Sequence, residues 1–233
     1  MRKLLLLILI ILISMNLSLF AKKKPAILLK KNLEQWQQFK WQGIIQVQSS
    51  AFSMRKNFVL AKDSTSLRLD VLDSGIIGLQ AKPFLILYLK DRIVIDAPEI
   101  EQLQGLDLNW FVPPGSIEKL MHFTDSLQLK QQEIISKREL KTANTIFSFD
   151  KKYRLSNIKS TDFNIEANII YNRRNYSTKI QIKYNGTPMA ELQINEREYK
   201  DIEIVPLEFN PGTIDYDKIL HDIPLNNSET EPE

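Results

Sequence analysis

Apolar and polar residues alternate along much of the chain from residue 41 onward, most regularly between residues 163 and 194. Side chains of a strand point to opposite faces in turn, so each run separates into an apolar and a polar face. The apolar positions of the three most regular runs are Phe163, Ile165, Ala167, Ile169 and Tyr171, then Ile180, Ile182 and Tyr184, then Ala190, Leu192 and Ile194. Less regular runs predict strands at 41–48, 54–62, 66–72, 84–89 and 92–96.

Helical spacing interrupts this pattern in two places. Near the N-terminus, Leu33, Trp36 and Phe39 predict a short amphipathic helix that leads into the first strand. In the middle of the chain, residues 99–103 predict one short helix, stopped by Gly105. A second helix is predicted to start near residue 114 with Ser116 as its N-cap, and strands resume near residue 132.

The polar faces of the predicted strands carry lysine and glutamate, so we expect those faces to meet water and the apolar faces to point inward. The fold class is therefore mainly β, of α+β type. We predict an open, strongly curved antiparallel half-barrel of about 10–11 strands. An N-terminal helix precedes the sheet, and the helix pair lies over its opening.

The first 21 residues have the order of a secretory signal peptide: Arg2 and Lys3, an apolar run over 4–13, and a small residue, Ala21. An uncleaved signal anchor is the alternative, because three lysines follow directly at 22–24. The sequence thus predicts a signal segment (1–21), one half-barrel domain (22–225) and a disordered acidic tail (226–233). The expected location is the periplasm, with membrane association if the segment is retained or through an apolar hairpin.

Composition excludes several classes of function. Lys and Arg number 31 against 28 Asp and Glu, which is too small an excess for a nucleic-acid partner. Cysteine is absent, so no disulfide, thiolate metal site or cysteine nucleophile is available. His122 and His221 are far apart in sequence, and neither has a second ligand-type residue at metal spacing. We therefore predict no catalytic residues, no metal and no cofactor.

What remains is apolar surface on the inward faces of the strands. A curved sheet of this width either packs its interior with its own side chains or leaves a cavity for an apolar ligand. The cavity residues predicted from strand phase, with two from the second helix, are Leu67, Leu69, Val71, Phe84, Ile86, Ile93, Ile95, Leu120, Met121, Phe163, Ile165, Ile169, Ile180, Ile182, Leu192 and Ile194.

Residues 72–84, LDSGIIGLQAKPF, place an isoleucine pair between two glycines where a polar turn is expected. Two readings stay open. Gly75 and Gly78 would let a loop project with Ile76 and Ile77 exposed at its tip, or the chain turns earlier and Ile77 is the first inward residue of the next strand.

The order of these parts resembles the LolA and LolB family of periplasmic lipoprotein-trafficking proteins. Residues 67–81, LRLDVLDSGIIGLQA, and 96–120, DAPEIEQLQGLDLNWFVPPGSIEKL, are more similar to LolB. The resemblance implies an open half-barrel that holds lipoprotein acyl chains. It also implies a hairpin tip, here Ile76 and Ile77, that contacts the outer membrane. LolB proteins are anchored through a lipobox cysteine, and this chain has none.

Two functions follow from this sequence. The first is a non-enzymatic carrier or acceptor of lipid or lipoprotein acyl chains in the bacterial cell envelope, with a membrane surface as a further contact. The second is a structural or adaptor domain of the envelope whose core is filled and which binds a protein partner through a sheet edge. An enzyme on the same fold lacks a visible site.

Overall fold

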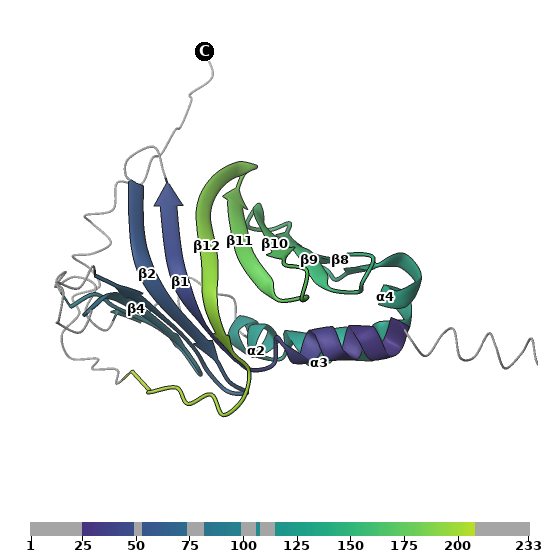
Figure 1. Ribbon diagram of the computed structural model, residues 1–233, viewed down its shortest axis with the longest axis horizontal. Helices are drawn as coiled ribbons and strands as arrows, with labels where there is room; N and C mark the ends of the chain where they lie inside the picture. Colours follow the sequence, from purple (N-terminus) through teal and green to yellow (C-terminus); the bar gives the residue numbers. More distant parts are fainter. Residues whose placement is uncertain (1–24, 49–52, 74–81, 99–105, 108–114, 208–233) are drawn as a thin grey trace, which may run out of the picture.

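A computed structural model describes residues 25–48, 53–73, 82–98, 106–107 and 115–207. Within these ranges the strands form one antiparallel sheet of 12 strands, in the order β6-β5-β4-β3-β2-β1-β12-β11-β10-β9-β8-β7. The sheet is strongly curved and open, with helices on its concave side (Figure 1). The predicted antiparallel half-barrel is therefore confirmed. The signal segment, Ile76 and Ile77, the helix over 99–103 and the acidic tail lie outside the described residues.

The strands follow the predicted segments closely in the first half of the chain. Their bounds are β1 Phe39–Gln48, β2 Ser53–Lys62, β3 Leu67–Leu72, β4 Pro83–Leu89, β5 Ile93–Asp96, β6 Leu106–Asp107, β7 Glu139–Lys141, β8 Thr145–Phe149, β9 Leu155–Ser160, β10 Ile165–Tyr171, β11 Ser177–Tyr184 and β12 Thr187–Glu198. Most strands that are adjacent in the sheet are also consecutive in the chain and are joined as hairpins.

The exception is the pairing of β1 with β12, which joins the first and second halves of the chain at the centre of the sheet. The register shifts between Gln42 and Gly43. A Cβ atom added to Gly43 would lie 1.8 Å from the backbone oxygen of Gln193. Only glycine therefore fits this close approach of the two central strands.

The N-terminal helix spans residues 25–34, earlier than predicted. Trp36 lies in the following turn and Phe39 begins β1, so the predicted helix over all three apolar residues was wrong. Their rings gather beside Trp41 instead, with ring centroids 5.3 Å apart for Trp36 and Trp41 and 4.0 Å for Phe39 and Trp41. Aromatic contact explains why an apolar spacing of three does not continue the helix here.

Three short helices follow residue 115: α2 Ser116–Met121, α3 Phe123–Leu129 and α4 Gln131–Lys137. The prediction of strands from residue 132 was wrong, because α4 occupies that segment. The N-cap is Gly115, in a left-handed conformation with φ of 74°, and Ser116 is the first helical residue rather than the cap. Glycine adopts this conformation without steric cost.

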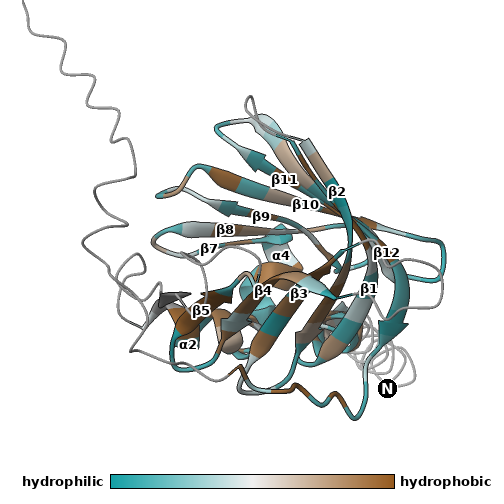
Figure 2. Cartoon of the chain, turned by 90° about the vertical axis from the view of Figure 1, so that its left-hand side faces the viewer, coloured by the Kyte–Doolittle hydropathy of each residue, from teal (hydrophilic) through white to brown (hydrophobic). Residues whose placement is uncertain are grey.

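These helices cover part of the concave side of the sheet. Leu29 and Leu33 of the N-terminal helix, Leu127 of α3 and Ile134 of α4 are buried in one cluster with strand residues such as Trp41. We call the face of the sheet that carries this cluster the inner face and the opposite face the outer face. Figure 2 shows the strongly hydrophobic stretches on β3, β4 and β5.

Turn 150–154, between β8 and β9, attaches the N-terminal helix. Asn32 donates through Nδ2 to the backbone oxygens of Lys152 and Tyr153, at 2.8 and 3.1 Å. The turn is held by Asp150, whose Oδ1 accepts from the backbone nitrogens of Lys152 and Arg154. Burial raises the pKa of Asp150, but hydrogen bonds from Arg154 and Lys152 outweigh it and leave the pKa below its ordinary value.

Within the described ranges, no helix combines the length and the apolar character needed to cross a membrane.

Candidate functional site

The inner face can be followed as rows of side chains, because directly paired residues of antiparallel strands point to the same face. One row runs across eight strands near the end of the sheet where β1 ends and β2 begins. We call it the upper row: Met54, Val47, Ala190, Ile182, Ala167, Ile158, Phe147 and Leu140. All but Leu140 are only partly buried. Aliphatic and aromatic side chains thus remain partly open to solvent on the concave side.

The next row toward the helices is covered. Ile45, Leu192 and Ile169 are buried there, with 6–7% of each residue exposed. Figure 1 shows β1, β2 and β12 extending beyond the helices, which pack against the other half of these strands. Within the described ranges, the helices therefore close one half of the inner face and also reach the β7–β8 end of the upper row, where Leu140 is buried and Phe147 stacks on Phe123 of α3. They leave the rest of the row, from Met54 to Ile158, uncovered.

Small residues indent the upper row on both sides of Ile182. Ala167 on β10 and Ala190 on β12 pair directly with Ile182 on β11. Neither alanine has side-chain atoms beyond Cβ, so each leaves space beside the isoleucine. The surface is apolar and lies on the concave side of the sheet, as a binding site for a flexible hydrocarbon requires.

One ion pair borders this surface on the β2 and β3 side. Lys56 and Asp73 contact each other through Nζ and Oδ1. The Lys56 ammonium also lies 5.0 Å from the centroid of the Phe84 ring. Lys56 pairs with Ile45, so the charge sits on the inner face next to apolar residues. The pair marks where the apolar surface gives way to a polar boundary.

A second lysine is buried at the covered end of the inner face. Lys62 pairs with Phe39 and Leu67, and its Nζ donates to the backbone oxygens of Gln37 and Asp63, at 2.9 and 3.2 Å. Burial lowers the pKa of Lys62, while the charges of Asp63 and Asp125 act in the opposite direction. Its hydrogen bonds tie β2 to the turn after the N-terminal helix, a structural role.

The outer face behind the upper row is polar and internally hydrogen-bonded. Gln181 Nε2 donates to Glu191 at 3.0 Å, and Asn157 Nδ2 donates to Asn168 at 2.9 Å. The hydrogen bond from Lys179 holds the pKa of Glu191 below its ordinary value. The strand register therefore places the polar residues of these strands on the outer face and the apolar residues on the inner face, as the alternation predicted.

Ile86 is placed on the wrong face by the sequence prediction. It pairs with Asp70 and Asp96 on the outer face, whereas Leu85 and Leu87 pair with Val71 and Leu69 on the inner face. The run FLILYL is apolar at every position, so alternation cannot fix its phase. Phe84 still contacts the core cluster, because the register shift after Val71 adds one residue to β4 at this point.

The outer face of β4 and β5 carries the apolar side chains of Ile86, Tyr88 and Val94 beside the charged residues of β3, and the segment after β12 lies against it. Arg68 Nη1 donates to the backbone oxygen of Val205 at 2.6 Å. Pro206 and Leu207 line a cavity of about 380 Å³ together with Tyr88 and Val94 of the outer face. The same segment is visible beneath β4 in Figure 1. Ile86 is buried on this same outer face, with 5% of the residue exposed.

Three further predicted cavity residues are exposed rather than enclosed, among them Ile165 at 36%. Leu120 is 47% exposed on α2, although its neighbour Met121 is buried. Phe163 is 55% exposed and precedes β10. The register places Ile165 and the other predicted residues on the inner face or in contact with it: Leu67, Leu69, Val71, Ile93, Ile95, Ile169, Ile180, Ile182, Leu192 and Ile194.

Several inner-face residues were missed. Val47, Met54, Leu85 and Ile158 all contact the core cluster. For Val47 a signal was present, since the run over 41–48 alternates with Trp41, Gly43 and Ile45 in the same phase. Ile158 stands among polar residues in LSNIKS, and the other apolar residue, Leu155, lies three positions away and so does not continue a strand alternation with it.

Other chemistry is not assembled in the part of the chain that the structure describes. No group of three or more His, Asp or Glu side chains there could hold a metal ion. The His122 side chain is 56% exposed and lies 3.3 Å from Asp125 Oδ2 on the helix surface.

No protein-family model matches the chain, and a search of curated proteins found no match. Among solved structures, the chain is similar to a LolA superfamily protein from Nitrosomonas europaea, with a TM-score of 0.43 and 9% sequence identity. The match covers 76% of this chain and 93% of the other. The narrower likeness to LolB stays a prediction.

Proposed function

We propose that this protein is a non-enzymatic carrier or acceptor of lipid or lipoprotein acyl chains, held on the uncovered half of the inner face. The observation that carries the proposal is the upper row. Large apolar side chains such as Met54, Val47 and Ile182 line a concave surface and yet are only partly buried. Each methylene of a hydrocarbon chain that is removed from water by such a surface contributes about 0.8 kcal/mol.

The polar outer face supports this assignment by contrast. Behind the upper row, amide and carboxylate side chains hydrogen-bond to one another, as a face directed at water does. An exposed apolar surface on one side of such strands has a cost in water unless it has an occupant. A hydrocarbon chain fits this surface because it needs shape and apolar contact but no hydrogen-bonding partner.

The first experiment asks what the protein carries. Organic extraction of the purified protein, followed by mass spectrometry, should release acyl lipids in a fixed ratio to protein. Titration of the delipidated protein with a fluorescent fatty acid should then show saturable binding. A protein that yields no lipid and does not bind the probe would end the proposal.

A pair of matched variants locates the site. Ile182→Asn changes the upper row, and Ile170→Asn makes the same change on the adjacent strand at a half-exposed outer-face position that pairs with Lys179. The first variant should weaken binding of the fatty acid about tenfold, equivalent to about 1.4 kcal/mol. The second should leave it unchanged. Equal effects of both variants would place the probe elsewhere.

An envelope adaptor with a filled core is the competing function. It is favoured by the covered half of the inner face, where Leu33, Trp41 and Ile134 leave almost no exposed surface. An adaptor of this kind would bind neither lipid nor probe, and Ile182→Asn would then change only stability. The extraction and titration therefore separate the two functions directly.

A further inference from the structure

The uncovered part of the upper row crosses six neighbouring strands, β2, β1, β12, β11, β10 and β9. We call it the open row: Met54, Val47, Ala190, Ile182, Ala167 and Ile158. Each residue pairs directly with the next, so the side chains form one continuous line across the sheet. All six are apolar and only partly buried. The open row is therefore an apolar surface one residue wide that runs across the strands.

Buried residues border the open row on the side of the helices. Ile45, Leu192 and Ile169 lie two residues from members of the open row on the same strands, and 6–7% of each is exposed. Side chains two residues apart on a strand share a face, so the covered surface begins directly beside the open row. A ligand on the open row cannot move toward the helices without displacing packed side chains, and it therefore lies along the row.

One end of the open row is closed. After Ile158 the line of paired residues continues to Phe147, whose ring stacks on Phe123 of α3 with ring centroids 6.4 Å apart. The Phe123 ring also lies 6.3 Å from that of Trp36, and Leu140 on the next strand is buried. Phenylalanine rings offer no hydrogen bond, so a polar group placed here would lose its hydration without replacement. This end suits the methyl group of a hydrocarbon chain.

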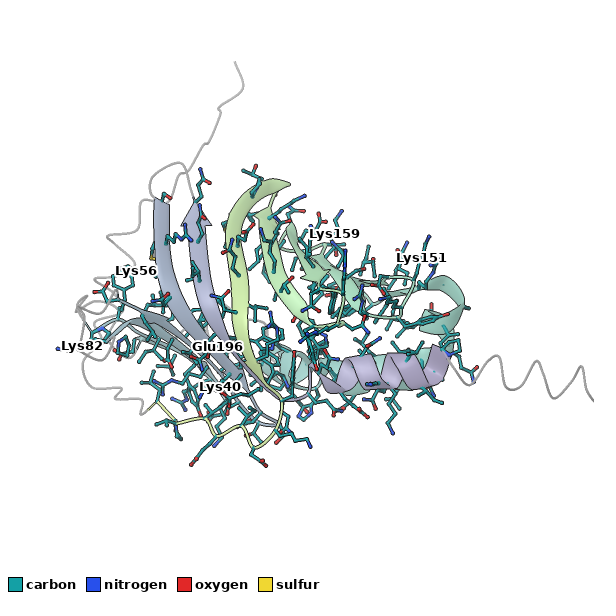
Figure 3. All side chains as sticks on the ribbon, in the orientation of Figure 1. Lys40, Lys56, Lys82, Lys151, Lys159 and Glu196 are labelled. Atoms are coloured by element: carbon teal, nitrogen blue, oxygen red, sulfur yellow. The ribbon has the colours of Figure 1, made fainter. Side chains whose placement is uncertain are left out.

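The other end of the open row is polar and hydrated. Lys56 lies two residues from Met54 on β2, on the same face, and its ion pair with Asp73 leaves the two side chains 23% and 42% exposed. The pair is matched in charge, so it does not select a charged ligand, but it keeps hydrogen-bonding groups and water at this end. In Figure 3, Lys56 and Lys159, the neighbour of Ile158 on β9, lie on opposite sides of the central strands and mark the two ends.

The distance between the two ends defines a length. Neighbouring strands lie about 4.8 Å apart, so the five spacings from β2 to β9 add up to about 24 Å. The sheet is strongly curved, and a path on its concave side is shorter than this sum. An extended chain of tetrahedral carbons advances about 1.2 Å per bond, so the open row matches a chain of about 16–18 carbons.

We propose that the open row holds one acyl chain of about 16–18 carbons, extended across the strands, with its methyl end at Phe147 and its polar end beside Met54. The inference rests on the proposed function and adds to it the length and the direction of the chain. A shorter chain leaves part of the open row in water. A longer chain meets the stacked phenylalanine rings at one end and returns to water at the other, so its additional carbons gain little.

The first test measures the length. Saturated fatty acids and the matching alcohols, from about 8 to about 22 carbons, compete with a fluorescent fatty acid for the full chain. Affinity should rise about fourfold per added methylene, equivalent to about 0.8 kcal/mol, and level off at about 16–18 carbons for acids and alcohols alike. Affinity that levels off much earlier, or rises through the whole series, would overturn the inference alone. No binding at any length would contradict the proposed function on which it rests.

A blocking variant locates the chain. Ala167→Phe places a large side chain in the open row, one strand before Ile158. The length at which affinity levels off should fall by about 4–8 carbons, while a chain of about 10 carbons binds as before, because its methyl end does not reach β10. Unchanged short-chain binding also shows that the variant is folded. Ile170→Phe, at a half-exposed outer-face position of the same strand, is the matched control and should change nothing. Equal effects of the two variants would overturn the inference.

The direction is tested with a fluorophore on a single introduced cysteine, since the chain has none of its own. Ser53→Cys lies beside Met54 on β2, and Ser160→Cys lies two residues after Ile158 on β9. Stearic acid with a nitroxide near its carboxyl group should quench the label at position 53 more strongly, and stearic acid with a nitroxide near its methyl end should quench the label at position 160. The reverse pattern would overturn the direction. Equal quenching of both labels by both probes would show that the chain does not lie along the open row.

Discussion

The two halves of the inner face have the same sequence pattern and opposite surroundings. On β1, Trp41 and Ile45 are buried under the helices, whereas Val47, two residues further in the same phase, is only partly buried. On β10, Ile169 is covered and Ile165 is exposed. In both halves the inner face is mainly apolar and the strands pair in the same antiparallel way, although the covered half has larger side chains. The difference arises from where the N-terminal helix and α2 to α4 end.

This difference shows that an apolar strand face has two separate uses within one sheet. Where helices cover it, the face contributes hydrophobic stabilisation and fixes the curvature of the sheet. Where they do not, the same face is a surface that an apolar molecule can occupy. Substitutions in the two halves should therefore separate stability from binding, and the four predictions that follow are arranged by the size of the expected effect.

The largest effect is expected at the seam between the two central strands. Gly43→Val places a branched side chain against the backbone of Gln193, where a Cβ alone would lie 1.8 Å from the oxygen. β1 and β12 cannot keep their register, so we expect loss of the folded sheet rather than a graded change. Circular dichroism and the elution volume on gel filtration would show it, and a folded variant with native stability would contradict the observed approach.

Trp41→Ala tests the covered half. Trp41 is 1% exposed and stacks on Phe39, so its removal leaves a large cavity in the cluster. We expect the free energy of unfolding to fall by about 3–5 kcal/mol, measured by urea denaturation. Binding of a fatty acid per folded molecule should be unaffected under conditions where the variant remains folded.

Asp150→Asn tests the attachment of the covering helix. The substitution removes the ion pair with Arg154, whose Nη2 lies 2.5 Å from Oδ2, and weakens turn 150–154 beneath Asn32. The expected loss at pH 7 is about 1 kcal/mol, because the pair is partly open to solvent.

The pH dependence of this loss follows from the lowered pKa of Asp150. A carboxyl group with a lower pKa in the folded state stabilises the fold above its ordinary pKa of about 3.9, and the contribution disappears as the pH falls through the folded-state value. The difference between wild type and Asp150→Asn should therefore shrink on acidification. A difference that stays constant from pH 7 to pH 2 would contradict this role for the carboxylate.

The smallest effect on stability is expected in the upper row. Met54→Ala removes a partly buried side chain at the uncovered end of β2, so the free energy of unfolding should change by less than about 1 kcal/mol. Binding of a fatty acid should nevertheless weaken. A loss as large as that of Trp41→Ala would mean that Met54 is packed within the core and that the two halves do not differ.

The fold was largely predictable, because its strands alternate and its hairpins are short. The inward phase was correct for Ile180, Ile182, Leu192 and Ile194, where each apolar residue stands between polar ones. It failed at Ile86, where a strand is apolar on both faces and the segment after β12 packs on the outside. No local pattern announces that contact, since it joins Arg68 to a residue far along the chain, Val205.

The division into covered and uncovered halves was not predictable for a similar reason. The alternation shows which face a residue takes but not how far a helix from another part of the chain reaches over it. The prediction of the N-terminal helix was wrong at Phe39 for the same reason. Phe39 continues the helical spacing of apolar residues, yet it begins β1 and stacks on Trp41. Tertiary contacts decide in such places.

The seam between β1 and β12 has a consequence for biogenesis. Lys40 of β1 pairs with Glu198 of β12. The edge of β1 that pairs with β12 therefore has no partner until almost the whole domain has been synthesised and, if exported, has crossed the membrane. Until then an unpaired apolar edge is available for association with other chains, and contacts of such long sequence separation form slowly. We therefore expect the newly made polypeptide to depend on chaperones, and the yield of native protein to fall when it is produced rapidly.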